Sequence, residues 1–135
     1  VHPRSMCKTI KQKVKFKAPP ADIYRFLSDS RAQTELTGLE AILSKKIGGS
    51  FSALAGDVSG VIGDLLPPLR IVQAWRRSDF PDGIFSMASF HLKPTSDGGT
   101  ELVLTHRGVP KELIPAVEAG WREKFWGRIK ERIQT

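Results

Sequence analysis

The chain has 135 residues, of which 40% are hydrophobic and 26% charged, and this balance fits one globular domain rather than a disordered or fibrous chain. No apolar run approaches the roughly 20 residues that span a bilayer, and no secretory leader is recognisable. Lys and Arg number 21 against 14 Asp and Glu, giving a formal net charge of +7, and residues 1–17 contain six of the positive charges and no acid. Such a localised basic face can bind an acidic protein, nucleic acid or an anionic membrane surface.

The N-terminus and the single cysteine indicate the domain boundary and the compartment. Residues 1–6 are interpreted as a loose leader, either disordered or foreign to the native chain, and we expect a single domain over residues 7–135. Cys7 has no second cysteine with which to form an intramolecular disulfide. This cysteine usage suits a reducing compartment, so we expect a cytoplasmic protein.

The first predicted element is a half-buried strand over residues 9–17, because apolar and basic residues alternate along it with a period of two. One face carries Ile10, Val14 and Phe16, and the other carries Lys11, Lys13, Lys15 and Lys17. The two prolines at 19 and 20 end the strand. Two short helices are predicted next, the first from Pro20 or Asp22 and the second to about Leu36, where Gly38 stops it.

Six further strands are predicted after Gly38, because short apolar or alternating runs are separated there by Gly, Pro and Asp turns. The runs are residues 40–45, 51–54, 58–66, 70–77, 85–93 and 100–107. A Ser-Asp-Gly-Gly turn at residues 96–99 joins the last two runs and is a strong hairpin signal. Consecutive strands with short connections imply a meandering antiparallel sheet.

A long amphipathic helix is predicted at the end of the chain, where apolar residues recur every four positions. They are Val117, Trp121, Phe125, Ile129 and Ile133. Gly120 and Gly127 are weak helix formers, and we expect them to let the helix backbone approach the sheet closely. The order of elements predicts an α+β helix-grip fold, in which a curved antiparallel sheet of about seven strands, with two short helices after its first strand, carries the C-terminal helix across its concave face.

Several short motifs, in this order and spacing, give the chain a family resemblance. They are Gly-Gly-Ser-Phe at 48–51, Gly-Asp-Val-Ser-Gly at 56–60, Ile-Val-Gln-Ala-Trp-Arg at 71–76, Phe-Pro-Asp-Gly at 80–83, Gly-Thr-Glu-Leu at 99–102, Gly-Val-Pro at 108–110 and Gly-Trp at 120–121. The sequence resembles the C-terminal domain of the activators of the heat-shock protein 90 ATPase, within the birch-allergen-like and lipid-transfer superfamily. Full-length activators carry a separate N-terminal domain with no counterpart here, so the chain is interpreted as an excised domain or as a short stand-alone relative.

Side chains for catalysis or metal binding are not found in a suitable pattern. Catalysis needs a positioned acid, base or nucleophile, and the two histidines of the last hairpin have neither such a partner nor a third metal ligand at a suitable spacing. Strand alternation predicts that His91 points outward, and that His106 points inward as a hydrogen-bonded core residue. We therefore expect a binding protein with no enzymatic activity, metal or cofactor.

The predicted binding surface is the outward face of the first strand and of the last two strands, which a helix-grip meander brings together. The partner-binding candidates are Lys11, Lys13, Lys15, Lys17, Phe85, Met87 and Arg107. The lysines also fit a plain solvated strand face, or one that discourages edge pairing, and that alternative stays open. The resemblance implies heat-shock protein 90 as partner and promotion of its ATPase cycle as function. No nucleic-acid or membrane partner is expected, and we expect a monomer.

A second hypothesis concerns the inward residues, which in lipid-transfer relatives would line a cavity between the sheet and the C-terminal helix. They are Phe16, Ile62, Trp75, Phe90, Leu102, Trp121 and Phe125. A carrier or sensor of a small hydrophobic ligand is the alternative function that these residues allow. A packed core uses the same residue types, and a cavity of several hundred Å³ would distinguish the carrier from the packed core.

Overall fold

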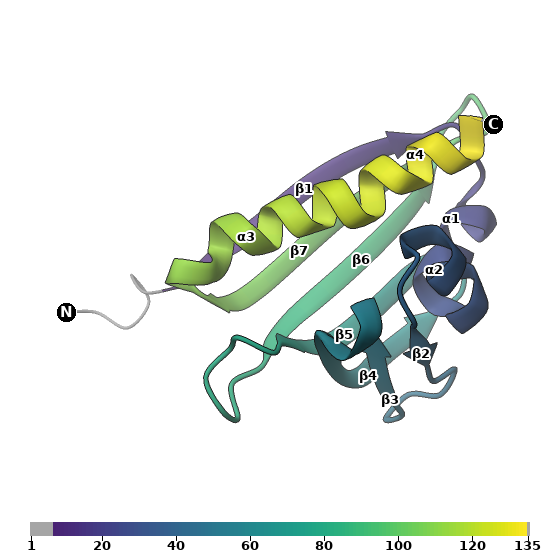
Figure 1. The fold of residues 1–135 in the computed structure, drawn as a ribbon. Coiled ribbons are helices and arrows are strands. Elements are labelled where there is room, and N and C mark those ends of the chain that lie inside the picture. The colour runs from purple at the N-terminus through teal and green to yellow at the C-terminus, as the bar shows by residue number, and fades with distance from the viewer. Residues whose placement is uncertain (1–6, 135) are drawn as a thin grey trace.

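The computed structural model describes residues 7–134 (Figure 1), and residues 1–6, interpreted above as a leader, lie outside the described part. The strands are β1 (Cys7–Phe16), β2 (Ile42–Leu43), β3 (Ser50–Ala53), β4 (Val58–Leu66), β5 (Arg70–Arg77), β6 (Ser86–Pro94) and β7 (Thr100–Pro110). The α-helices are α1 (Pro20–Ser28), α2 (Ser30–Thr37), α3 (Ile114–Gly120) and α4 (Gly127–Gln134). Short 3-10 turns form η2 (Leu54–Gly56) and η3 (Lys111–Leu113), and a π-helical segment forms η4 (Trp121–Trp126).

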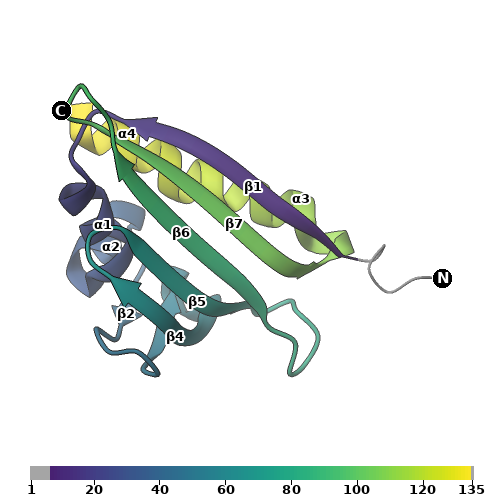
Figure 2. The ribbon, with the colours of Figure 1, turned by 180° about the vertical axis from the view of Figure 1, so that it is seen from behind.

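The seven strands form one antiparallel sheet in the order β1-β7-β6-β5-β4-β3-β2. The first strand therefore pairs with the last, and the remaining strands follow as a meander. The continuous helix α3–η4–α4 runs across one face of the sheet (Figure 1). The short helices α1 and α2 lie near the α4 end of this helix. From behind, β1, β7 and β6 present a face that no helix covers (Figure 2). This arrangement confirms the predicted helix-grip fold.

The ends of the two short helices follow from single residues. Pro20 occupies the first turn of α1, where its missing N–H costs nothing. Asp29 caps α2 by accepting a hydrogen bond from the backbone N–H of Ala32 at 2.9 Å. Gly38 then ends α2 in the left-handed conformation at φ 76°, which confirms its predicted role as a stop.

The predicted strand over residues 40–45 is shorter in the structure. Only Ile42 and Leu43 pair, opposite Ser52 and Phe51 of β3. β2 is the edge of the sheet, and α2 takes up backbone groups on its free side: Ala41 N–H donates to Thr34 Oγ1 at 2.9 Å and Leu43 N–H donates to Ser30 Oγ at 2.8 Å.

The C-terminal helix differs from the prediction because its middle turns are π-helical. A spacing of four residues drifts by roughly 40° per step around an α-helix of 3.6 residues per turn, and the wider η4 turn takes up this drift. The expectation for the two glycines is wrong. A Cβ at Gly120 would meet nothing within 4 Å, and one at Gly127 would meet the Arg122 carbonyl oxygen of the same helix at 3.0 Å, so neither glycine marks a close approach to the sheet. No helix in the described part of the chain combines the length and apolarity needed to cross a bilayer.

The core lies between the concave face of the sheet and the C-terminal helix. Trp121 and Trp126 stack with ring centroids 5.7 Å apart, and Phe90 of β6 meets Trp121 edge-on at 5.3 Å. Gln12 of β1 ties the two layers together, because its amide accepts from Trp126 Nε1 at 2.7 Å and donates to the Glu118 carbonyl at 3.1 Å. The helix is therefore held to the sheet by aromatic packing and by a directed polar contact.

Candidate functional site

The lysines of β1 form one edge of the uncovered sheet face. Lys11 lies opposite Thr105 of β7 and Lys13 lies opposite Val103, while Lys15 faces Glu101. Side chains on one face of a strand are about 6.8 Å apart, so these lysines form a ladder of positive charge. Lys17, just beyond the end of β1, is also exposed. The predicted adjacency of β1, β7 and β6 and the outward orientation of the lysines are confirmed.

The other predicted surface residues lie on β6 and β7. Met87 is 44% exposed and pairs with Arg107 of β7 on one side and Ala74 of β5 on the other. Phe85 is 48% exposed and lies just ahead of β6, which begins at Ser86 rather than at the predicted Phe85. The guanidinium carbon of Arg76 lies 5.9 Å from the centroid of the Phe85 ring, at the distance of a cation–π contact.

The same face extends across β5 and β4 to residues that the sequence did not assign to it. Val61 of β4 is 42% exposed and pairs with Ala74, which pairs in turn with Met87. Half-buried Val72 lies one step further along β5. Alternation along residues 70–77 separates Val72 and Ala74 from the core positions, but only the strand order makes them neighbours of Met87.

The charges on this face, which we call the outer face, are mostly unpaired positive charges. Among the described residues, the ion pairs within 4 Å include neither Lys11 nor Lys13, whereas Arg70 Nε lies 2.7 Å from Asp64 Oδ2. The outer face therefore combines a basic ladder at one edge with an apolar strip at its centre. This combination suits a partner with an apolar patch and acidic surroundings.

The two histidines lie as predicted, with His91 exposed and His106 fully buried. Trp121 Nε1–H donates to His106 Nδ1 at 3.1 Å, so the ring hydrogen is on Nε2, which donates to Ser86 Oγ at 2.7 Å. Ser86 Oγ–H donates in turn to the Trp75 carbonyl at 2.8 Å. Burial lowers the pKa of His106 to about 3, so the ring is neutral. Within residues 7–134, no cluster of three His, Cys, Asp or Glu side chains could hold a metal ion.

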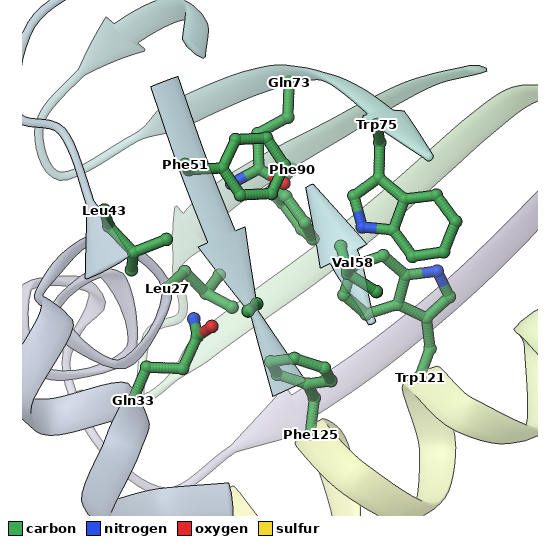
Figure 3. A pocket seen from close by; sticks show the side chains of 11 residues that line it. Leu27, Gln33, Leu43, Phe51, Val58, Gln73, Trp75, Phe90, Trp121 and Phe125 are labelled. Carbon is green, nitrogen blue, oxygen red and sulfur yellow. The ribbon is translucent and has the colours of Figure 1, made fainter. Parts of the chain in front are cut away.

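The seven residues proposed to line a cavity are all buried, but they do not enclose one large space. Trp75, Phe90, Trp121 and Phe125 line a central space of about 20 Å³ (Figure 3). That is roughly the room for one water molecule. Ile62 lines a separate cavity beside α1, and Phe16 and Leu102 do not line the central space. Trp75, Trp121 and Phe125 also line an open groove of about 340 Å³ between η2 and the C-terminal helix. The enclosed centre is therefore that of a packed core, and the larger space lies at the open side of the helix.

The architecture and the outer face define a helix-grip protein with an aromatic core beneath its C-terminal helix and an uncovered sheet face that carries exposed basic and apolar side chains. The chain belongs to the family described as Activator of Hsp90 ATPase homolog 1-like protein, whose profile matches residues 17–134. The family match confirms the resemblance carried by the sequence motifs.

Individual relatives agree with this assignment. The chain is 31% identical over 125 residues to the Activator of 90 kDa heat shock protein ATPase homolog 1 of Homo sapiens, covering 93% of this chain and 36% of that protein. Identity to the Dictyostelium discoideum homologue is 28% over 123 residues, covering 91% of this chain and 32% of that protein. The chain thus spans about a third of the length of these relatives. The crystal structure of an HSP90 activator from Plasmodium falciparum matches with a TM-score of 0.87 at 23% identity, covering 93% of this chain and 96% of that one, which supports the fold.

Proposed function

We propose that this chain is a co-chaperone module that binds heat-shock protein 90 and promotes its ATPase cycle. The observation that carries the proposal is the match to the activator family over residues 17–134, together with relatives that are named activators of this ATPase. In this proposal residues 7–135 act as one domain, as a monomer in the cytoplasm. The domain contributes binding and no chemistry of its own.

The outer face is the proposed docking surface. Lys11 and Lys13 project from the backbone of a paired strand and lack ion-pair partners within the described residues, so their charge is available to an acidic surface. Such charges mainly raise the association rate and its dependence on salt. Phe85 and Met87 supply the aromatic and thioether side chains that are enriched at interface centres, and Arg107 lies beside Met87.

Promotion of the ATPase cycle follows if the module binds the hydrolysing arrangement of the chaperone more tightly than its other states. A ligand shifts a conformational equilibrium only by the difference in its affinities for the two states. A tenfold preference corresponds to about 1.4 kcal/mol, which one well-buried apolar anchor such as Met87 can supply.

The test compares two double variants in binding and ATPase assays with the purified chaperone. Lys11→Glu/Lys13→Glu reverses two charges that face uncharged Thr105 and Val103, and leaves Lys15 opposite Glu101. Lys124→Glu/Lys130→Glu is the matched control, because both residues are exposed on the C-terminal helix. Each double variant lowers the formal net charge from +7 to +3, since every Lys→Glu change removes two units.

We expect the β1 variant to bind roughly tenfold more weakly at low salt and to lose most of its salt dependence, while the control binds like the wild type. ATPase stimulation should need a correspondingly higher concentration of the β1 variant. Equal weakening in both variants would refute the outer face as the docking surface. Absence of binding by the wild type at low salt would refute the proposed function itself.

A further inference from the structure

Another cavity lies beside α1 and borders the central space, since Leu27 and Leu43 line both. Its volume is about 270 Å³, and α1, β2, β4, β5 and the turn after β4 contribute its walls. In Figure 2, α1 lies beside the end of the sheet where β4 turns into β5. Most of the lining is apolar: Leu27, Leu43, Ile62, Leu65, Pro67 and Ile71. An apolar cavity of about 150 Å³ stays dry and binds benzene, so this one has room for about ten non-hydrogen atoms.

One polar group in this cavity lacks the partner that a buried polar group needs. Tyr24 lines the cavity and is only 7% exposed, and its hydroxyl finds no hydrogen bond within the described residues. An unsatisfied buried donor costs about 1–3 kcal/mol. Burial, and secondarily the negative charge of Asp64, raise the pKa of Tyr24, so the phenol keeps its proton and is a donor.

The charged groups around the cavity are already neutralised by other residues. Lys45 at the rim lies 3.1 Å from Asp29 Oδ1, and Asp64 is paired with Arg70 at 2.7 Å. A ligand therefore meets neither a free cation nor a free anion there. What a ligand can supply is one hydrogen-bond acceptor for the Tyr24 hydroxyl.

We propose that the cavity beside α1 binds a small, uncharged and mostly apolar molecule with one acceptor oxygen, such as an aryl or alkyl ketone. The hydrocarbon part fills the space between Leu27, Ile62 and Ile71, and the oxygen accepts the hydrogen bond from Tyr24. This site is distinct from the outer face. It shares Leu27 and Leu43 with the central space, whereas Tyr24, Ile62 and Ile71 line this cavity alone, and it does not depend on the chaperone partner.

Two probes of nearly the same shape test the proposal. Acetophenone carries the carbonyl oxygen, and α-methylstyrene replaces that oxygen with a methylene group. Each is titrated into the ¹⁵N- and methyl-labelled full chain, as the wild type and as Tyr24→Phe, and binding is followed by chemical-shift changes. Tyr24→Phe removes only an unpaired hydroxyl, so its unfolding midpoint should equal or exceed that of the wild type.

We expect acetophenone to shift the methyl signals of Leu43, Ile62 and Ile71 in the wild type, and to bind Tyr24→Phe about three- to tenfold more weakly. The affinity of α-methylstyrene should be the same for both proteins. Three results would each overturn the proposal: no shift up to the solubility limit, which would mean that the cavity holds water only; shifts confined to Trp121 and Phe125; or equal affinity of acetophenone for both proteins.

Discussion

Acidification should destabilise this domain through His106 well before its carboxylates titrate. The neutral ring is fixed as one tautomer, because Nδ1 accepts from Trp121 and Nε2 donates to Ser86. Protonation would place an N–H on Nδ1 against the indole N–H of Trp121. The charge would also be fully buried, since the side chain has no exposed surface.

The magnitude follows from the difference between the folded and unfolded pKa values. The pKa of His106 is about 3 in the folded protein and about 6.5 in an unfolded chain. Because the unfolded state binds the additional proton, this contribution is complete above pH 6.5 and is lost as the pH falls toward 3. The free energy of unfolding should fall by about 1.4 kcal/mol per pH unit in this window, and by about 2.7 kcal/mol between pH 8 and pH 4.5.

Urea unfolding between pH 8 and pH 4.5 measures this loss in the wild type and in two variants. His106→Gln removes the titrating group and leaves a polar partner unsatisfied, so at pH 8 it should be less stable than the wild type by about 1–3 kcal/mol. The stability of His106→Gln should then change little with pH. The difference in free energy of unfolding between this variant and the wild type should therefore narrow as the pH falls. The control is His91→Gln on β6, which should follow the wild-type curve because His91 is exposed.

The comparison isolates His106 from the other acid-sensitive groups. Hydrogen bonds to Asp29, Asp79 and Asp97 lower the pKa of each carboxyl, so their contributions are lost only below about pH 4, and they are shared by all three proteins. A gap between the wild type and His106→Gln that stays constant from pH 8 to pH 4.5 would refute the argument. An NMR titration that shows His106 gaining its proton near pH 6.5 in the folded protein would refute it too.

Two further predictions concern the backbone and are checked by the same unfolding measurement. Ala55 in η2 has a φ of 57°, a left-handed conformation that costs a non-glycine residue about 1–2 kcal/mol, so Ala55→Gly should stabilise the protein by roughly 0.5–1 kcal/mol. Ala116→Gly in α3 should instead cost about 1 kcal/mol, and the same sign for both changes would contradict the assignment of strain. Gly120→Ala should stabilise by up to about 1 kcal/mol because its Cβ meets open space, whereas Gly127→Ala should gain less because of the Arg122 carbonyl at 3.0 Å. An equal gain in the free energy of unfolding at both positions would contradict the close approach of the Arg122 carbonyl oxygen to residue 127.

The strands that the sequence predicted best are those with strong turn residues at both ends. β4 and β5 begin and end at the predicted residues, since Gly56 and Asp57 precede one strand and Pro67 and Pro68 separate the two. β2 was overestimated because a strand persists only where a neighbour offers backbone partners. That neighbour is determined by the tertiary fold and cannot be read from the alternation itself.

The π-helical segment could not be predicted from helix propensity, yet the sequence contains a signal for it. A strict spacing of four residues from Val117 to Ile133 does not keep one face of an ordinary α-helix toward the sheet. In addition, Phe125 and its neighbour Trp126 are both buried. A wider turn between Gly120 and Gly127 resolves both features.

The β1, β6 and β7 part of the candidate surface could be predicted, because alternation assigns each residue of a strand to one face. The strand order then had to come from the helix-grip resemblance, which brought Lys11, Arg107 and Met87 together. Val61 was missed because no local pattern indicates which strands become neighbours. The cavity beside α1 was missed for another reason: a void depends on how side chains from α1, β4 and β5 fill space, and composition does not determine that.

β1 carries the basic ladder on its outer side and contacts the core and the C-terminal helix on its inner side, so the position of the lysines depends on the packing of the core. Gln12 points inward and is held by Trp126 and by the Glu118 carbonyl, whereas its sequence neighbours Lys11 and Lys13 point outward. The strand is therefore fixed on both sides, by the β7 ladder and by the C-terminal helix. Since the backbone beneath the lysines is fixed, the docking proposed for this face would need to order only their side chains. This preorganisation lowers the entropic cost of association.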